Sequence, residues 1–301
     1  DLWQLALVRL YHGVATAIFI PVAMAYVSDL FRRERGEKMG WFSTATLLGR
    51  FLAPAAGGAI IGVLAFDPAL SYRVVYLVCG VAGVIALLLV LGVREPVEHQ
   101  GAAQPWDETW RVFRTVVAQR GILITGIVEA SILFAYGTFE TFLPLYAREA
   151  GLTAYEVGVC LSAQVITLAL TKPQMGRLSD RHGRQPQIAA GAFIGALCIG
   201  TFAFFNSFPA LLLLSVLFGL SLSVVSSATS AFIADLSERR AHGSAMGILG
   251  SVMDIGHTTG PLVSGFVAAR LGIGASFLGA ALVVAGVGVI FLSTVGMRHR
   301  A

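Results

Sequence analysis

The stretch 176–185 reads GRLSDRHGRQ and joins two long apolar segments of the chain, 157–174 and 188–205. Three arginines, one aspartate and two glycines lie within these ten positions, whereas the flanking segments contain almost no charge. Each flanking segment has close to the roughly 20 apolar residues that a helix needs to cross the hydrocarbon core of a membrane. Because Gly183 can adopt a positive φ at little cost, the stretch predicts a tight polar turn between two membrane-spanning helices.

Outward from this turn, the chain repeats the same alternation of apolar segments and polar connections. Apolar residues make up 56% of the 301 residues, charged residues 13%, and the mean hydropathy is +0.78, whereas soluble domains carry about 25% charged residues. The apolar runs are also longer than the roughly ten-residue alternating strands of membrane barrels. We therefore predict an all-α polytopic membrane protein with nine transmembrane helices, at 2–28, 39–64, 74–92, 122–145, 157–174, 188–205, 210–234, 245–268 and 275–295.

The basic residues are distributed unevenly between the two sides of the predicted membrane. Fifteen of the 21 lie in the first, third, fifth and seventh connections and the C-terminal tail, and three lie within spans. The alternate connections hold only Arg73, Arg148 and Arg270. Because basic connections stay in the cytoplasm, we expect a multi-pass protein of the cell membrane (plasma or inner) with a cytoplasmic C-terminus. This distribution explains the net charge of +4 without a nucleic-acid partner.

An internal repeat divides the chain into halves. The segment 36–58 recurs at 243–265, with glycine on glycine four times and Pro54 on Pro261 at one offset of 207 positions. Parallel six-helix repeats describe one large transporter architecture. At this offset the start of the second half near Gly121 corresponds to position −86, so we expect about 86 further residues, enough for three helices, before Asp1. The predicted domains are the remainder of an N-terminal helix bundle at 1–94, a cytoplasmic central linker at 95–120 and a C-terminal six-helix bundle at 121–301.

The stretch 176–185 resembles the G-x-x-x-D-R-x-G-R signature of the major facilitator superfamily. All five fixed positions are matched, by Gly176, Asp180, Arg181, Gly183 and Arg184. The resemblance implies a twelve-helix, two-bundle fold of which this chain holds the fourth to twelfth helices. It also implies a cytoplasmic gate, in which Asp180 lies near the start of the span at 39–64 and Arg181 or Arg184 reaches Asp235.

A second segment is similar to the glycine–proline pattern on the fifth helix of the family's proton-coupled exporters. The matching positions are Gly40, Gly49, Pro54, Gly57 and Gly58, and Ala53 replaces one fixed glycine. Small residues let helices approach closely, and proline permits a bend. We expect Gly49, Gly57 and Gly58 to provide close packing, so that a bulky residue at Gly57 would block helix movement. Ordinary packing without an exporter role is the alternative.

Ionisable residues inside membrane spans are costly and call for an explanation. Glu129 and Glu140 lie eleven residues apart on the span at 122–145, within about 20° of each other on one helical face. Thr125 and Tyr136 share this polar stripe, which predicts a cavity-lining face. The alternative is a carboxylate near a helix end that reaches water, and Glu140 is more open to that alternative than Glu129.

Three further positions complete the candidates for transport and proton coupling. Arg50 lies in mid-span, and its repeat equivalent is His257, three residues after Asp254. Arg50 or His257 would either form a structural ion pair with a buried carboxylate or take part in proton coupling. Arg9, in the pattern RLYHG, resembles a family arginine implicated in proton coupling. The full set of candidates is therefore Glu129, Glu140, Tyr136, Arg50, Asp254 and Arg9.

The sequence also argues against other energy sources and chemistries. The six histidines show no metal-ligand spacing, no phosphate-binding G-x-x-x-x-G-K-[ST] loop is present, and no cofactor is expected. We predict a monomeric, non-enzymatic secondary transporter, working by alternating access and exporting a small organic or drug-like solute in exchange for protons. Uptake or symport of a sugar, organic acid or other solute is the alternative within this fold. A membrane enzyme would need a catalytic cluster that we do not find, and an inactive fragment lacking the first three helices is the remaining alternative.

Overall fold

The computed structural model describes residues 2–31, 35–93, 114, 118–236 and 242–295. Within these ranges it contains nine α-helices longer than one turn. They are α1 Leu2–Leu30, α2 Arg35–Val63, α3 Pro68–Leu91, α5 Arg120–Glu149, α6 Ala154–His182, α7 Arg184–Thr201, α8 Phe208–Leu236, α9 His242–Leu271 and α10 Ile273–Val295, with a short 3₁₀ helix, η1 Phe202–Phe204, after α7. Each predicted span lies within or largely overlaps one of these helices, so the all-α prediction is confirmed.

The chain divides into two compact units. Unit 1 comprises 1–50 and 78–102, and unit 2 comprises 51–77 and 103–301. The boundary therefore passes through α2 and α3, and the predicted division at 94 and 121 stays a prediction. The central linker predicted at 95–120 lies almost entirely outside the described residues.

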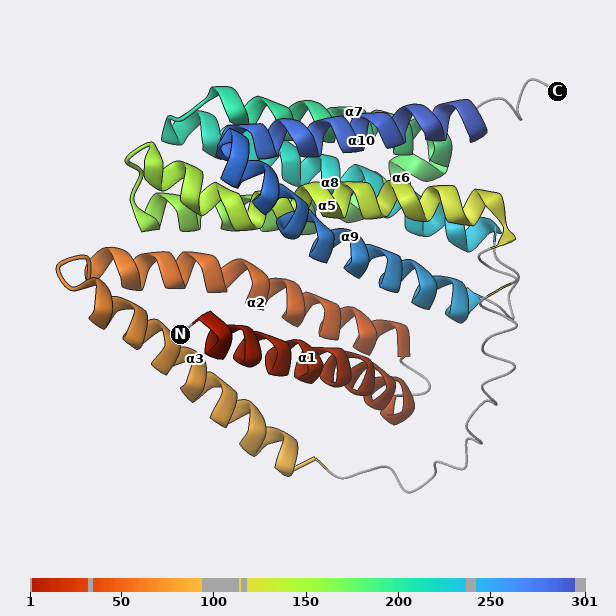
Figure 1. Ribbon diagram of the computed structural model, residues 1–301. Coiled ribbons are helices and arrows are strands. Elements are labelled where there is room, and N and C mark those ends of the chain that lie inside the picture. Colours follow the sequence, from red (N-terminus) through yellow and green to blue (C-terminus); the bar gives the residue numbers. More distant parts are fainter. Residues whose placement is uncertain (1, 32–34, 94–113, 115–117, 237–241, 296–301) are drawn as a thin grey trace. The chain divides into compact units, whose positions relative to one another are not determined.

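Helices α5–α10 form one bundle within unit 2 (Figure 1). In it, α6 packs on α8, α5 packs on α9, and α10 packs on both α7 and α5. The bundle's core contains an aromatic cluster in which Phe139 of α5 contacts Phe202 and Phe218, with ring centroids 5.4 and 5.3 Å apart. Half of the residues of α5 are buried. This central position decides which polar groups α5 brings into the protein interior.

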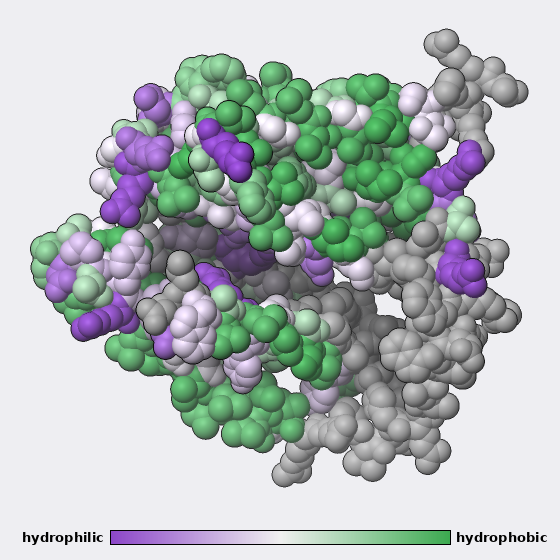
Figure 2. All heavy atoms as spheres, in the orientation of Figure 1, coloured by the Kyte–Doolittle hydropathy of each residue, from purple (hydrophilic) through white to green (hydrophobic). Residues whose placement is uncertain are grey.

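The outer surface of this bundle is apolar, as a lipid-facing surface must be. Figure 2 shows hydrophobic residues over most of the visible face formed by α7 and α10, where Leu197 and Leu282 are exposed. Among the described residues, six helices are long and apolar enough to cross a membrane: α3, α5, α6, α7 with η1, α8 and α10. In α2 the apolar part is the shorter segment Leu48–Val63.

Candidate functional site

Glu129 is fully buried within the α5–α10 bundle. Its Oε2 lies 2.6 Å from the hydroxyl oxygen of Thr229 on α8. The same hydroxyl lies 3.0 Å from the carbonyl oxygen of Val225 and 3.3 Å from that of Ser226. The contact therefore ties α5 to α8 within the bundle.

The arrangement around Thr229 suits a neutral Glu129. A hydroxyl donates one proton and accepts others, whereas backbone carbonyls only accept. The Thr229 hydroxyl donates to Glu129 Oε2 and also lies near the carbonyl oxygens of Val225 and Ser226, so one hydroxyl proton has three possible acceptors. An ionised Glu129 would compete with two carbonyl oxygens for the single hydroxyl proton, in an interior where an isolated charge is costly.

Unpaired polar atoms lie in the same part of the bundle. Among the described residues, the Oε1 of Glu129 and the hydroxyls of Ser223 and Ser226 are buried without a hydrogen-bond partner. Buried polar groups are nearly always satisfied in folded proteins. Glu129 Oε1 can therefore receive a further hydrogen-bond donor.

The polar stripe on α5 runs from the bundle interior to its surface. Thr125 and Glu129 are fully buried and Tyr136 is nearly so, whereas 46% of the Glu140 side chain is exposed. The cavity-lining role of this stripe stays a prediction, and the structure shows that Glu129 contacts Thr229 of α8. The sequence shows which residues share a helical face but not which helix packs against it.

Glu140 pairs with His257 of α9, with 3.0 Å between Glu140 Oε2 and His257 Nε2. Tyr136 stacks on the imidazole ring, with centroids 5.2 Å apart and planes inclined by 16°. The pairing of His257 with a carboxylate was anticipated, but the carboxylate is half-exposed rather than buried. Three groups that can exchange protons or bind polar solutes therefore meet on one side of the α5–α9 pair.

The remaining coupling candidates are exposed. Arg9 on α1 and Arg50 on α2 belong to unit 1, and Asp254 lies on α9 of unit 2. Sequence reasoning did not single out Thr229 as the partner of Glu129. Its spacing within a serine- and threonine-rich α8 was visible, but such residues often bond only to backbone carbonyls of their own helix.

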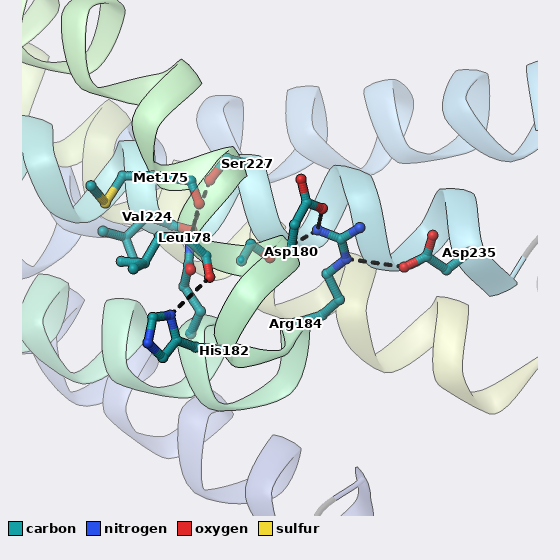
Figure 3. A network of polar contacts seen from close by, with 10 residues as sticks. Met175, Leu178, Asp180, His182, Arg184, Val224, Ser227 and Asp235 are labelled. Carbon is teal, nitrogen blue, oxygen red and sulfur yellow. Dashed lines mark hydrogen bonds and ion pairs between the residues drawn. The ribbon is translucent and has the colours of Figure 1, made fainter.

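The predicted tight turn between α6 and α7 is a single residue, Gly183, whose φ is +92°. Arg184, the first residue of α7, forms ion pairs with Asp180 in the last turn of α6 and with Asp235 near the end of α8 (Figure 3). The distance between Arg184 Nε and Asp235 Oδ2 is 3.0 Å. The predicted contact between Arg184 and Asp235 is thus present, and its role as a gate stays a prediction. The predicted proximity of Asp180 to the start of the span at 39–64 stays a prediction, because that segment belongs to unit 1.

Replacing Arg184 with glutamine should slow transport more than it destabilises the protein. Arg184 bridges the carboxylates of Asp180 and Asp235, whose side chains are 62% and 57% exposed. Exposed ion pairs contribute about 1 kcal/mol or less to the free energy of unfolding. Transport rates in liposomes and thermal unfolding temperatures would be compared with those of Arg177→Gln, which removes an exposed arginine two turns away. Equal transport by the two variants would contradict a gating role for Arg184.

The glycine–proline segment of α2 packs closely at only one of its two adjacent glycines. A methyl group on Gly58 would lie 2.6 Å from the carbonyl oxygen of Ala154 on α6, and one on Gly158 would lie 2.5 Å from that of Pro54. Nothing lies within 4 Å of the corresponding positions on Gly49 and Gly57. The expectation of close packing at Gly49 and Gly57 stays a prediction. The neighbourhood of Gly40 lies outside the described residues.

Comparison with known proteins places these features in one family. The family model described as "Major Facilitator Superfamily" matches residues 1–163 and 125–300. The chain is 26% identical to "Multidrug resistance protein MdtG" of Enterobacter lignolyticus over 94% of its length and 68% of the relative's. It is also 32% identical to "Multi-drug resistance efflux pump PmrA" of Streptococcus pneumoniae, over 46% of its length and 35% of the relative's.

A solved structure has the same fold. It is a bacterial homolog of the human lysosomal transporter Spinster, in an inward-facing and unoccupied conformation. The TM-score is 0.67 at 14% sequence identity, over 91% of this chain and 72% of that one. At this identity the likeness concerns the fold alone.

Proposed function

Because the chain belongs to the major facilitator superfamily, whose members transport small molecules across membranes, we propose that it exports drug-like organic solutes in exchange for protons. The observation that carries the proton exchange is the fully buried Glu129 and its hydrogen bond to Thr229. The similarity to a multidrug resistance protein and a multidrug efflux pump supports the export of organic solutes.

Glu129 would act as the proton carrier. Burial favours its neutral form, and the hydroxyl of Thr229 donates a hydrogen bond to its Oε2. Lys172 of α6, an exposed cation, interacts electrostatically with Glu129. A change in the packing of α5 against α6 or α8 that admits water or strengthens this attraction would therefore release the proton.

The pair Glu140–His257 would extend the same exchange toward the surface. Both side chains change charge by gaining or losing a proton, and they lie 3.0 Å apart. They are accessible, whereas Glu129 is not. We assign Glu129 to proton storage and the exposed pair, with Tyr136, to proton entry or to contact with the solute.

We further propose that the protein lies in the cell membrane with a cytoplasmic C-terminus. The two moving bodies would be the bundles predicted at 1–94 and 121–301, joined by a linker at 95–120. In this orientation Arg184, Asp180 and Asp235 lie on the cytoplasmic side, and the connections α2–α3 and α5–α6 lie outside.

The full-length protein in liposomes tests this function, with pH gradients of both signs and a permanently charged fluorescent dye. A proton exchanger accumulates the dye in vesicles whose lumen is more acidic, because solute and protons move in opposite directions. A symporter accumulates it in vesicles with an alkaline lumen. Protein-free vesicles give the background. Accumulation that does not depend on the gradient, or that requires an alkaline lumen, would contradict the proposal.

A further inference from the structure

A cavity of about 630 Å³ lies within unit 2, where the end of α2 and the start of α3 face the end of α5 and the start of α6. Its volume falls within the roughly 300–1,000 Å³ typical of small-molecule sites. It does not include the polar residues of α5 and α8 described above. It therefore requires an explanation separate from proton exchange.

Glycine and proline residues make the cavity possible. Gly58 and Gly158 bring α2 and α6 into backbone contact, and the hollow lies beside this contact. Gly57 has no atom within 4 Å of the position where a side chain would begin. Most of the remaining wall is aliphatic, with Ile61, Leu152 and Leu161 among its residues. The interior thus suits a hydrocarbon chain.

The cavity has one charged residue in its wall, Arg148 near the end of α5. The other lining residues are apolar or uncharged. The nearby carboxylates Asp67 and Glu156 are engaged in helix caps, with the backbone N–H of Leu70 and with Thr153 respectively. The N-terminus of α6 at Ala154 also forms part of the wall, and the helix dipole adds positive potential there. The electrostatics thus favour one anionic group at the edge of an apolar hollow.

We propose that this cavity binds a single-chain amphipathic carboxylate, of the chemical class of a long-chain fatty acid. The carboxylate pairs with the guanidinium of Arg148, whose planar fork matches its geometry. The hydrocarbon chain lies in the hollow beside the contact of α2 with α6. The volume is that of one small ligand, which favours a single chain over a two-chain phospholipid. This site is distinct from the proposed proton carrier.

A photoactivatable palmitate analogue with a diazirine on its chain tests the site in the purified full-length protein. We expect cross-links to peptides that contain Ile61 and Leu161. In Arg148→Gln the half-saturating concentration should rise at least about tenfold, the usual effect of losing a hydrogen bond to a charged group. In Gly57→Leu the added side chain fills the hollow and the cross-links should disappear. Thermal unfolding of both variants confirms that they are folded.

Arg270→Gln is the matched control, because Arg270 is an exposed arginine near the end of α9 that does not line the cavity. It should label like the wild type. An analogue that carries an alcohol in place of the carboxylate should label weakly, and phosphatidylglycerol should not displace palmitate. Equal labelling of Arg148→Gln and Arg270→Gln, or equal labelling by the alcohol, would overturn the proposal. Displacement by phosphatidylglycerol would reassign the site to a phospholipid headgroup and would likewise refute a fatty-acid site.

Discussion

Replacing Glu129 by glutamine should abolish the response of transport to an imposed pH gradient while preserving solute binding. Glutamine has nearly the same shape, and its amide oxygen can accept from the hydroxyl of Thr229 as Glu129 Oε2 does. It cannot release a proton at any accessible pH. In liposomes with an acidic lumen, we expect dye accumulation to fall to the level of protein-free vesicles. Dye binding, measured by fluorescence polarisation, should remain near the wild-type value.

Three further variants separate proton exchange from packing. Glu149→Gln changes a carboxyl group at the exposed end of the same helix and should transport like the wild type. Thr229→Val removes the hydroxyl at nearly constant volume, and leaving a buried polar partner unsatisfied costs about 1–3 kcal/mol. It should therefore weaken the pH response, whereas Thr229→Ser should largely restore it. Gradient-driven accumulation by folded Glu129→Gln would show that another group carries the proton.

The positions of the helices follow from composition and hydropathy alone. The span predicted at 122–145 is the middle of α5, Arg120–Glu149, and the span predicted at 275–295 matches α10, Ile273–Val295. Long apolar runs leave a chain few alternatives in a membrane, because every backbone polar group must be satisfied within its own helix. The turn at Gly183 also followed from the sequence, and the resemblance to the family implied that Arg181 or Arg184 reaches Asp235; the structure pairs Arg184 with it.

The environments of individual side chains could not be predicted from the sequence in this way. The eleven-residue spacing of Glu129 and Glu140 places them on one face of α5, but the identity of the helix that covers this face depends on tertiary packing. Coverage by α8 buries Glu129, and α9 supplies His257 to Glu140. The cavity beside Arg148 was equally hidden, since its walls come from four helix ends that are distant in sequence. The only feature of the sequence that pointed to this cavity was Arg148, a single arginine in a connection with few basic residues.

The two adjacent glycines of α2 show the same limit of prediction from sequence. Gly57 and Gly58 point about 100° apart on α2, so at most one of them can face α6 directly. The structure assigns this contact to Gly58. A sequence pattern that contains both cannot distinguish them, because either would satisfy the requirement for a small residue.

Gly58→Leu should therefore block transport, whereas a leucine at an uncrowded glycine should not. Even a single methyl group on Gly58 would lie 2.6 Å from the carbonyl oxygen of Ala154, a backbone atom that can move only if α2 and α6 separate. If the bundles predicted at 1–94 and 121–301 are the moving bodies, this contact must form and break in each transport cycle. We expect Gly58→Ala to slow dye accumulation and Gly58→Leu to reduce it to background.

The matched control is Gly286→Leu, at an exposed glycine within α10 that has no neighbour within 4 Å of the substituted position. Both substitutions replace glycine by leucine in a helix interior, where leucine is the better helix former, so propensity cannot explain a difference between them. Overpacking costs about 1–3 kcal/mol, and thermal unfolding shows whether Gly58→Leu remains folded. A folded Gly58→Leu protein with wild-type transport would show that α2 and α6 need not approach at this point. Lost transport in a folded protein, with Gly286→Leu active, would identify the Gly58–Ala154 contact as one that the transport cycle must form.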